Sequence, residues 1–194
     1  MAETEAPIHE HRSRLLEGMA HAVAAKGYAD TTIADIVREA SVSRRTFYEH
    51  FTSKAECLVA LYEAASHNAL KVLQGAIDPA QPWQAQVEGA LTAYLGCMAA
   101  NPVLMRTLYI EILGLGPQGL AARRRVNQEI ADFMLRVVNG AQGKGTPPLS
   151  RQMAMAVVGG INELVLEYLE QDKLDRLAEL AVPAGALVRA ATNG

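Results

Sequence analysis

The sequence predicts an all-α protein of about nine helices. Apolar residues recur at spacings of three and four along most of the 194 residues, as an amphipathic helix requires. Leu, Ala and Glu are plentiful and β-branched residues rarely cluster, which favours helices over strands. Gly and Pro interrupt the periodic stretches and mark where helices end. We find no strand pattern and no internal repeat, so we expect helices alone.

The first helix is expected at residues 10–26. Its apolar face consists of Leu15, Leu16, Met19, Ala20 and Val23. Gly27 follows directly, where the end of a helix favours a residue that tolerates a positive φ.

A short second helix is expected between Thr32 and Ala40. Thr32 offers an N-cap, and Asp35 three residues later comes close to a capping box. The buried side of this helix is expected to consist of Ile33, Ile36 and Val37.

A third helix is expected at residues 44–50, after a tight turn at residues 41–42. Ser43 can cap it. Phe47 and Phe51 lie four residues apart, so both rings are expected to face the core.

The remaining helices are expected to be longer. Ser53 and Glu56 form another capping box, which opens a helix ending near residue 74. Pro82 lies in the first turn of the next helix, and Pro183 is expected to kink or split the last one. After the helix that Pro82 opens, the expected helices occupy residues 102–113, 118–139, 150–170 and 174–191.

Several classes of protein are excluded by composition and motifs. No run of about 18 uncharged apolar residues occurs, and the polar N-terminus lacks the order of a signal peptide, so we expect a cytoplasmic protein without a membrane partner. Cys57 and Cys97 form no CxxC pair, which argues against a disulfide framework and a thiolate zinc site. No HExxH, GxSxG or Gly-rich phosphate loop is present, so we expect no enzyme, no cofactor and no metal.

Residues 32–51 have the spacing of a helix-turn-helix, in which the second helix enters the major groove of DNA. The net charge of −3 does not itself favour nucleic acid, but residues 41–54 hold Arg44, Arg45 and Lys54 against Glu49 alone. Arginine suits bidentate contacts with guanine or phosphate. This segment therefore predicts DNA binding.

The string GYADTTIADIVREASVSRRTFYEHFTSKAECL, residues 27–58, resembles the DNA-binding signature of TetR-family repressors. The match has no gap, and its Thr-Phe-Tyr-x-His-Phe-x-Ser-Lys tail is rarely shared by other helix-turn-helix families. Ser41 stands where the family pattern usually has Gly, so it must accept a turn geometry that Gly adopts more freely. The resemblance implies DNA contacts by Thr32, Ser43, Arg44, Arg45, Thr46, Tyr48, His50 and Lys54.

The resemblance further implies a DNA-binding domain at residues 1–54 and a helical domain for ligand binding and dimerisation at residues 55–194. Aromatic and Met side chains suit an adaptable apolar pocket, although the same residues could fill an ordinary core. The expected pocket residues are Tyr62, Trp83, Tyr94, Met98, Met105, Tyr109, Phe133 and Met134.

The last two helices are expected to form the dimer interface, although their apolar stripes could equally line the core of one chain. The expected interface residues are Met153, Val157, Gly160, Ile161, Leu164, Tyr168, Leu177 and Leu180. The implied function is a homodimeric repressor that binds a palindromic operator in double-stranded DNA and is released by a small molecule. The alternatives are an activator and a ligand-independent DNA-binding or adaptor protein, which a solidly filled C-terminal domain would favour.

Overall fold

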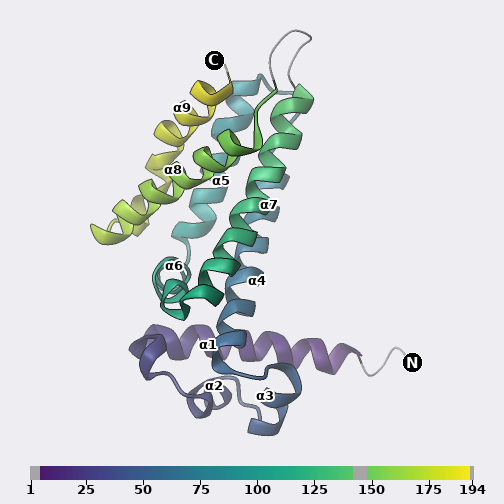
Figure 1. The fold of residues 1–194 in the computed structure, drawn as a ribbon, viewed down its shortest axis with the longest axis vertical. Coiled ribbons are helices and arrows are strands. Elements are labelled where there is room, and N and C mark those ends of the chain that lie inside the picture. Colours follow the sequence, from purple (N-terminus) through teal and green to yellow (C-terminus); the bar gives the residue numbers. More distant parts are fainter. Residues whose placement is uncertain (1–4, 142–147, 193–194) are drawn as a thin grey trace. The chain divides into compact units, whose positions relative to one another are not determined.

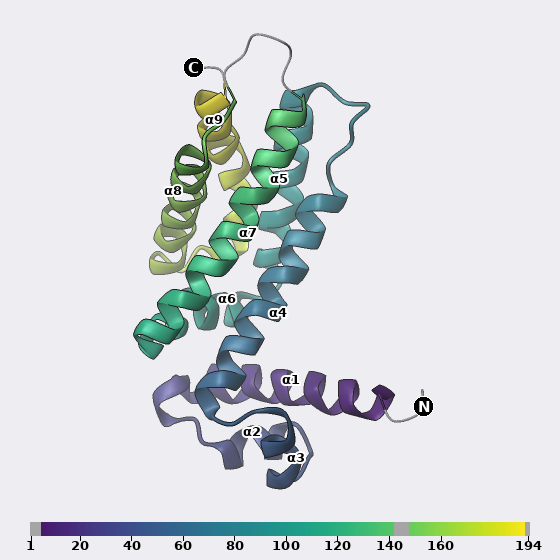
Figure 2. The same cartoon turned by 45° about the vertical axis from the view of Figure 1, so that its right-hand side comes forward.

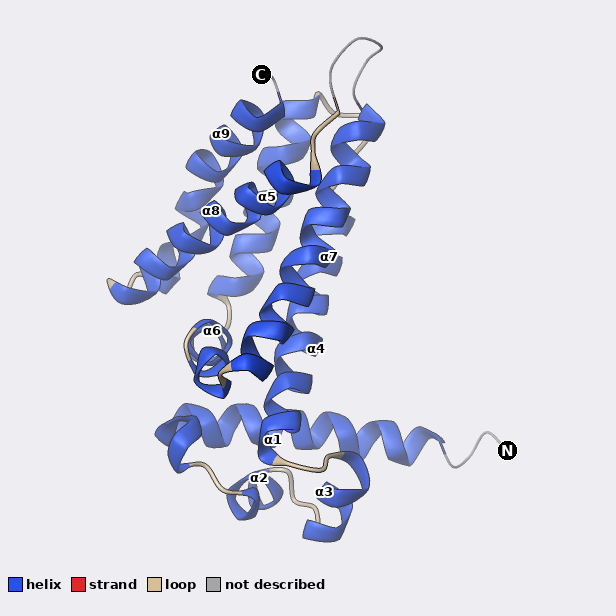
Figure 3. Cartoon of the chain, viewed as in Figure 1, coloured by secondary structure: helices blue, strands red, loops and turns tan. Residues whose placement is uncertain are grey.

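The structure, a computed structural model, describes residues 5–141 and 148–192, and every regular element in these ranges is a helix (Figures 1 and 3). This confirms the predicted all-α fold. The α-helices are α1 (Glu5–Asp30), α2 (Ile33–Glu39), α3 (Arg44–His50), α4 (Lys54–Gly75), α5 (Trp83–Ala99), α6 (Pro102–Tyr109), α7 (Pro117–Ala141), α8 (Arg151–Glu170) and α9 (Ala181–Thr192). Two 3₁₀ helices, η1 (Glu111–Leu115) and η2 (Leu174–Leu180), lie between them.

The predicted N-caps of α2 and α3 are confirmed. The Thr32 side chain accepts a hydrogen bond from the Asp35 N–H at 3.2 Å, and the Asp35 carboxylate accepts one from the Thr32 N–H at 2.9 Å. Ser43 accepts from the Thr46 N–H at 3.0 Å. Each cap satisfies an N–H group that has no partner within its helix.

The predicted capping box at the start of α4 is only half right. Ser53 accepts from the Glu56 N–H at 3.1 Å, as expected. The Glu56 carboxylate, however, accepts from the N–H and hydroxyl of Thr52 instead of from Ser53. The carboxylate thereby gains two donors from one residue, and the reciprocal half of the box is not formed.

Two predicted helices are each divided. The helix expected to reach residue 113 stops at Tyr109. The 3₁₀ helix η1 follows it and ends at Leu115, just before Gly116, whose φ is +58°. The last predicted helix consists of η2 and α9. Pro183 lies in the first turn of α9, where its missing N–H is harmless, so the division precedes Pro183 and is not caused by it.

The described residues form two compact units. The N-terminal unit comprises Met1–Ala65 and Arg106–Ala122, and the C-terminal unit comprises Ser66–Met105 and Arg123–Gly194. The predicted division into a DNA-binding domain at residues 1–54 and a ligand-binding domain at residues 55–194 is a division by function, and it stays a prediction. None of the helices in the described ranges combines the length and apolar character needed to cross a bilayer.

In the N-terminal unit, α1 lies across α2 and α3 (Figure 2). A Cβ at Gly18 would lie only 2.6 Å from the Ile36 carbonyl oxygen, so this glycine permits the close approach of α1 to α2. The side chains buried here include Leu15, Met19, Ile36, Phe47 and Leu58. Both Phe47 and Phe51 are buried, as predicted.

In the C-terminal unit, α5 packs against α9 and η2, and α8 packs against the same two elements. Figures 1 and 2 both show α8 and α9 side by side. One apolar cluster joins Leu70 and Leu73 of α4 to Ala90 of α5, and another joins α7 to α8. The pocket described below lies among these helices.

Candidate DNA-binding and ligand-binding sites

Helix α3 has one buried side and one solvent-exposed side. Phe47 is fully buried, and it contacts the rings of Tyr48 and Phe51 at centroid distances of 5.5 and 5.8 Å. Arg44, Arg45 and Tyr48 are exposed, Tyr48 to 59%. The helix is thus fixed by Phe47 and presents two guanidinium groups and a phenol to solvent. This is the arrangement that a recognition helix requires.

Local hydrogen bonds already hold several of the predicted DNA contacts. The hydroxyls of Ser43 and Thr46 lie 2.9 Å apart, and the Thr32 hydroxyl donates to the Asp35 carboxylate at 2.6 Å. Arg45 forms an exposed ion pair with Glu49 at 3.0 Å. Since an exposed pair of this kind contributes little, it does not prevent Arg45 from binding DNA.

Asp35 ties α2 to α1. Its carboxylate lies 2.6 Å from the Lys26 ammonium and 3.0 Å from the Arg38 guanidinium. Hydrogen bonds from Lys26 and then from Thr32 hold the pKa of this carboxyl well below its usual range. The capping box is therefore also an ion-pair site.

The C-terminal end of α1 and the short link to α2 are held from both sides. Gly27 has φ +79° and ψ 163°, so the predicted positive φ is confirmed, although ψ is extended. The Tyr28 N–H donates to the Glu111 carboxylate of η1 at 3.3 Å. The Lys54 ammonium donates to the carbonyl oxygens of Tyr28, Ala29 and Thr31 at 2.8, 3.3 and 2.7 Å, and it lies 4.2 Å from the centroid of the Tyr28 ring.

Lys54 was predicted from the sequence to contact phosphate, and that role stays a prediction. A lysine ammonium has three hydrogens to donate, and here it has three carbonyl acceptors. To reach a phosphate it would have to leave them. No local pattern predicts this role, because the acceptors lie 23 to 26 positions away in the sequence.

The turn between α2 and α3 is stabilised by Arg14 of α1. Its guanidinium donates to the carbonyl oxygens of Ala40 and Ser41 at 3.0 and 2.7 Å. Ser41 has φ +52°, a backbone conformation that glycine adopts more freely than serine, and the family pattern usually has Gly at this position. We conclude that Arg14 helps to hold this strained turn.

His50 lies at the end of α3, near residues of α1. Partial burial, followed by the neighbouring His11 and Arg12, lowers the pKa of His50, and Glu49 opposes this shift. Arg12 also lies 5.6 Å from the centroid of the Phe51 ring. His50 therefore favours its neutral form before DNA is bound.

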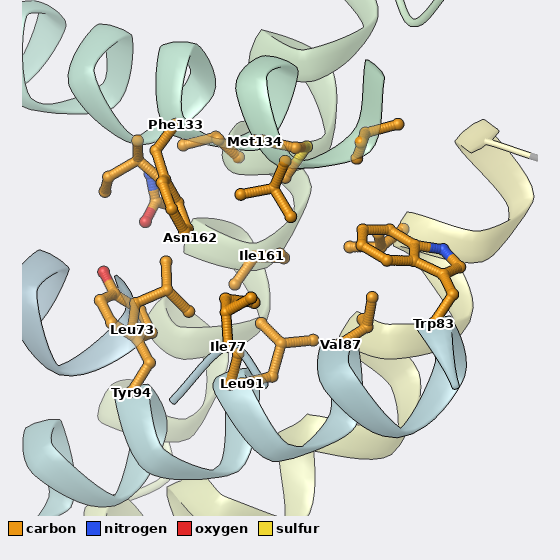
Figure 4. A pocket seen from close by; sticks show the side chains of 16 residues that line it. Leu73, Ile77, Trp83, Val87, Leu91, Tyr94, Phe133, Met134, Ile161 and Asn162 are labelled. Carbon is orange, nitrogen blue, oxygen red and sulfur yellow. The ribbon is translucent and has the colours of Figure 1, made fainter. Parts of the chain in front are cut away.

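The C-terminal unit contains an apolar pocket with a volume of about 80 Å³ (Figure 4). Four predicted ligand residues line it, namely Trp83, Tyr94, Phe133 and Met134. The other lining residues are Leu73, Ile77, Val87, Ala90, Leu91, Ile130, Val137, Val138, Val158, Ile161, Asn162 and Val188.

The other four predicted ligand residues do not line this pocket. Tyr62, Met98 and Met105 are buried elsewhere, and Tyr109 is half-buried. The side chain type could not separate them from the lining residues. A better signal was the spacing in α5, where the lining positions 83, 87, 90, 91 and 94 share one helical face.

The predicted dimer interface also requires correction. Val157, Leu177 and Leu180 are almost completely buried within the chain, and Ile161 is buried and lines the pocket. These four side chains have almost no exposed surface left for a partner. The remaining interface prediction rests on Met153, which is 47% exposed, and on the less buried Gly160, Leu164 and Tyr168.

Comparison with known proteins connects this geometry to a family. The family model for bacterial regulatory proteins of the tetR family matches residues 15–61, which span most of α1 through the start of α4. The transcriptional regulator SrpR of Pseudomonas putida is 25% identical over 160 residues, covering 80% of this chain and 72% of its own length.

Solved structures share the fold at low sequence identity. A TetR-family transcriptional regulator from Syntrophomonas wolfei has a TM-score of 0.75 at 18% identity, covering 94% of this chain and 95% of its own. The regulator FadR from Bacillus subtilis, solved in complex with stearoyl-CoA, has a TM-score of 0.71 at 16% identity, covering 91% and 96%. The helix-turn-helix at residues 15–61 therefore belongs to the TetR family of bacterial regulatory proteins, and the chain as a whole is similar to DNA-binding transcriptional regulators of that family.

Proposed function

We propose that this regulator is a repressor that binds a palindromic operator as a homodimer and releases it when a small molecule enters the C-terminal unit. The observation that carries the proposal is the exposed side of α3, which presents Arg44, Arg45 and Tyr48 to solvent. The opposite side of the helix is anchored by the buried Phe47. Such a helix reads one half-site, and a two-fold dimer reads two related half-sites.

Each predicted DNA contact takes a proposed role. Arg44 and Arg45, with Tyr48, would contribute to sequence preference, because guanidinium groups make bidentate contacts with guanine. The contacts proposed for phosphate and sugar, which position the protein without specifying sequence, are Thr32, Ser43, Thr46, His50 and Lys54.

The homodimer would form through α8 and α9. Met153 on α8 and Val182 on α9 are large apolar side chains that are 47% and 69% exposed. Apolar area of this kind favours burial against a second copy. Helices α8 and α9 pack on each other at Gly160, where an added Cβ would lie 2.9 Å from a Leu187 methyl carbon, so they can present a joint surface.

The pocket supports ligand control over the ligand-independent alternative. A C-terminal unit solidly filled with side chains would have favoured a plain DNA-binding or adaptor protein, and the sixteen lining residues instead surround a space. The similar fold of FadR, whose structure contains stearoyl-CoA, adds support for a small-molecule effector. Whether the regulator represses or activates depends on the position of the operator.

The proposed release follows from linkage. Helices α4 and α7 each contain residues of both units, so ligand binding in one can bias the conformation of the other. The ligand must bind the DNA-incompetent state more tightly, and DNA then weakens ligand binding by the same factor. We expect a coupling of about 1–3 kcal/mol.

The test is selection of bound sequences from random duplex DNA at fixed, near-physiological salt. A palindrome with half-sites about one helical turn apart is expected. Binding only at low salt with no enriched sequence would refute operator recognition. Equal operator affinity with and without a molecule proven to occupy the pocket would refute ligand-controlled release while leaving DNA recognition intact.

A further inference from the structure

The pocket wall is uncharged over all the described residues that form it. Thirteen of the sixteen lining side chains are aliphatic, Phe or Met, and the other three are Trp83, Tyr94 and Asn162. The described lining contains no Asp, Glu, Lys, Arg or His. A buried carboxylate or ammonium of a ligand would therefore lose its hydration without gaining a countercharge.

The hydrogen-bonding groups of the pocket are not evenly distributed. Figure 4 shows the Asn162 amide and the Tyr94 hydroxyl near one another at one end, and Trp83 at the opposite end. Asn162 donates to the Asn127 side chain at 3.1 Å, which restrains the amide. Both side chains already interact within the chain, but amide and phenol groups can each take part in more than one hydrogen bond, so a polar ligand atom would be directed to this end of the pocket.

Building on the proposed function, we infer that the effector occupies this pocket as an uncharged, mainly apolar molecule with one hydrogen-bonding group directed at Asn162 and Tyr94. Its apolar body extends along the aliphatic wall toward Trp83. The volume of about 80 Å³ limits a rigid ligand, so a larger one requires side chains such as Met134 to move. A charged group on the ligand must lie outside the pocket.

Trp83 makes the site directly measurable, because it is the single tryptophan of the chain and lines the pocket. Three probes share one carbon skeleton, namely 4-phenylbutan-1-ol, 4-phenylbutanoate and 4-phenylbutylammonium. Each is titrated into the full-length protein at pH 7 while Trp83 fluorescence is recorded. We expect the alcohol to bind at least about tenfold more tightly than either ion, because only the ions suffer unpaired burial of charge.

Variants locate the polar end. Asn162→Leu and Tyr94→Phe should each weaken binding of the alcohol several-fold, and Tyr94→Phe keeps the test valid if Asn162→Leu does not fold. Tyr28→Phe is the matched control, since Tyr28 is half-buried in the N-terminal unit and does not line the pocket. It should leave the affinity unchanged.

The inference is overturned if either ion binds as tightly as the alcohol, if no probe perturbs Trp83, or if Tyr94→Phe and Tyr28→Phe behave alike. The proposed function is judged separately, by operator binding in the presence of the same probes. An ion that binds the pocket and releases the operator refutes the uncharged effector alone. An alcohol that binds the pocket but leaves the operator affinity unchanged refutes ligand-controlled release and leaves the inferred ligand class intact.

Discussion

Asp35 shows how one carboxylate can serve several elements. It completes the cap of α2, pairs with Lys26 of α1 and pairs with Arg38 of α2. Asp35 itself is nearly buried, at 7% exposure. Its partners stabilise the charged form, so its pKa is low in the folded state.

This shift predicts a dependence of stability on pH. Because the pKa of Asp35 is lower in the folded than in the unfolded state, its contribution is fully present above the usual value of 3.8 and is lost as pH falls. We expect Asp35→Asn to lower the free energy of unfolding at pH 7 and to have a progressively smaller effect as the pH falls below 3.8, as measured by urea denaturation. Asp30→Asn, which removes an exposed carboxylate nearby, is the control. A constant difference between wild type and Asp35→Asn across this range would contradict the assignment.

Arg44 and Arg45 carry the prediction for DNA. Each change to Ala should weaken operator binding by about 1–3 kcal/mol where a base contact is lost, measured by titration at fixed salt. Arg124→Ala on α7 is the control, because Arg124 is also exposed but lies outside the helix-turn-helix. If both variants of α3 bind the operator normally, the assignment of the recognition helix is wrong.

At the scale of elements, glycine controls how closely α1 approaches α2. A Cβ at Gly18 would meet the Ile36 carbonyl oxygen at 2.6 Å and the Ala40 nitrogen at 2.9 Å, both of them backbone atoms that cannot easily move. Gly18→Ala should therefore lower the free energy of unfolding by about 1–3 kcal/mol. At Gly89 in α5 an added Cβ meets nothing within 4 Å, so Gly89→Ala should stabilise by up to about 1 kcal/mol. Thermal unfolding of the two variants checks both signs, and a stabilising Gly18→Ala would disprove the close approach.

The link between α1 and α2 gives the second prediction at this scale. Lys54→Met keeps the apolar stem but removes the ammonium that binds three carbonyl groups, so we expect a loss of about 1–3 kcal/mol in urea denaturation. Lys71→Met, at an exposed site on the same helix, should have almost no effect. Unchanged stability of Lys54→Met would contradict the structural role. A phosphate contact by Lys54 would appear separately, as a salt dependence of DNA binding that is flatter by about one unit.

Local sequence signals predicted most elements correctly. The caps at Thr32 and Ser43 join residues three positions apart, so the chemistry of each cap is contained in a short string. The 3₁₀ segments η1 and η2 were predicted as α-helix because apolar residues spaced three and four apart fit both.

Across the whole molecule, prediction was weaker wherever distant segments meet. Periodicity identified Val157 and Leu177 as apolar positions, but it could not tell whether their neighbours belong to the same chain or to a partner. In the same way, side chain type could not separate Trp83 and Tyr94, which line the pocket, from Met98 and Met105, which do not.

The remaining interface surface yields a prediction for the assembly. Met153→Glu should weaken the proposed dimer by at least about tenfold, or about 1.4 kcal/mol, because a charge would be buried at the interface. Leu120→Glu is the matched control, as Leu120 is 55% exposed on α7 in the N-terminal unit. Sedimentation equilibrium measures both. A Met153→Glu protein that dimerises like the wild type would place the interface elsewhere.

The hydrogen bond from Tyr28 to Glu111 joins positions 83 residues apart, and residues 106–122 belong to the same compact unit as the helix-turn-helix. A DNA-binding domain cut at the start of α4 would therefore lose this hydrogen bond. A chimera that joins residues 1–54 of this chain to another regulator does not contain Glu111, whose carboxylate accepts the hydrogen bond from Tyr28. We therefore expect operator specificity to be exchanged with less disturbance by substitution on the outer face of α3 than by recombination of whole domains.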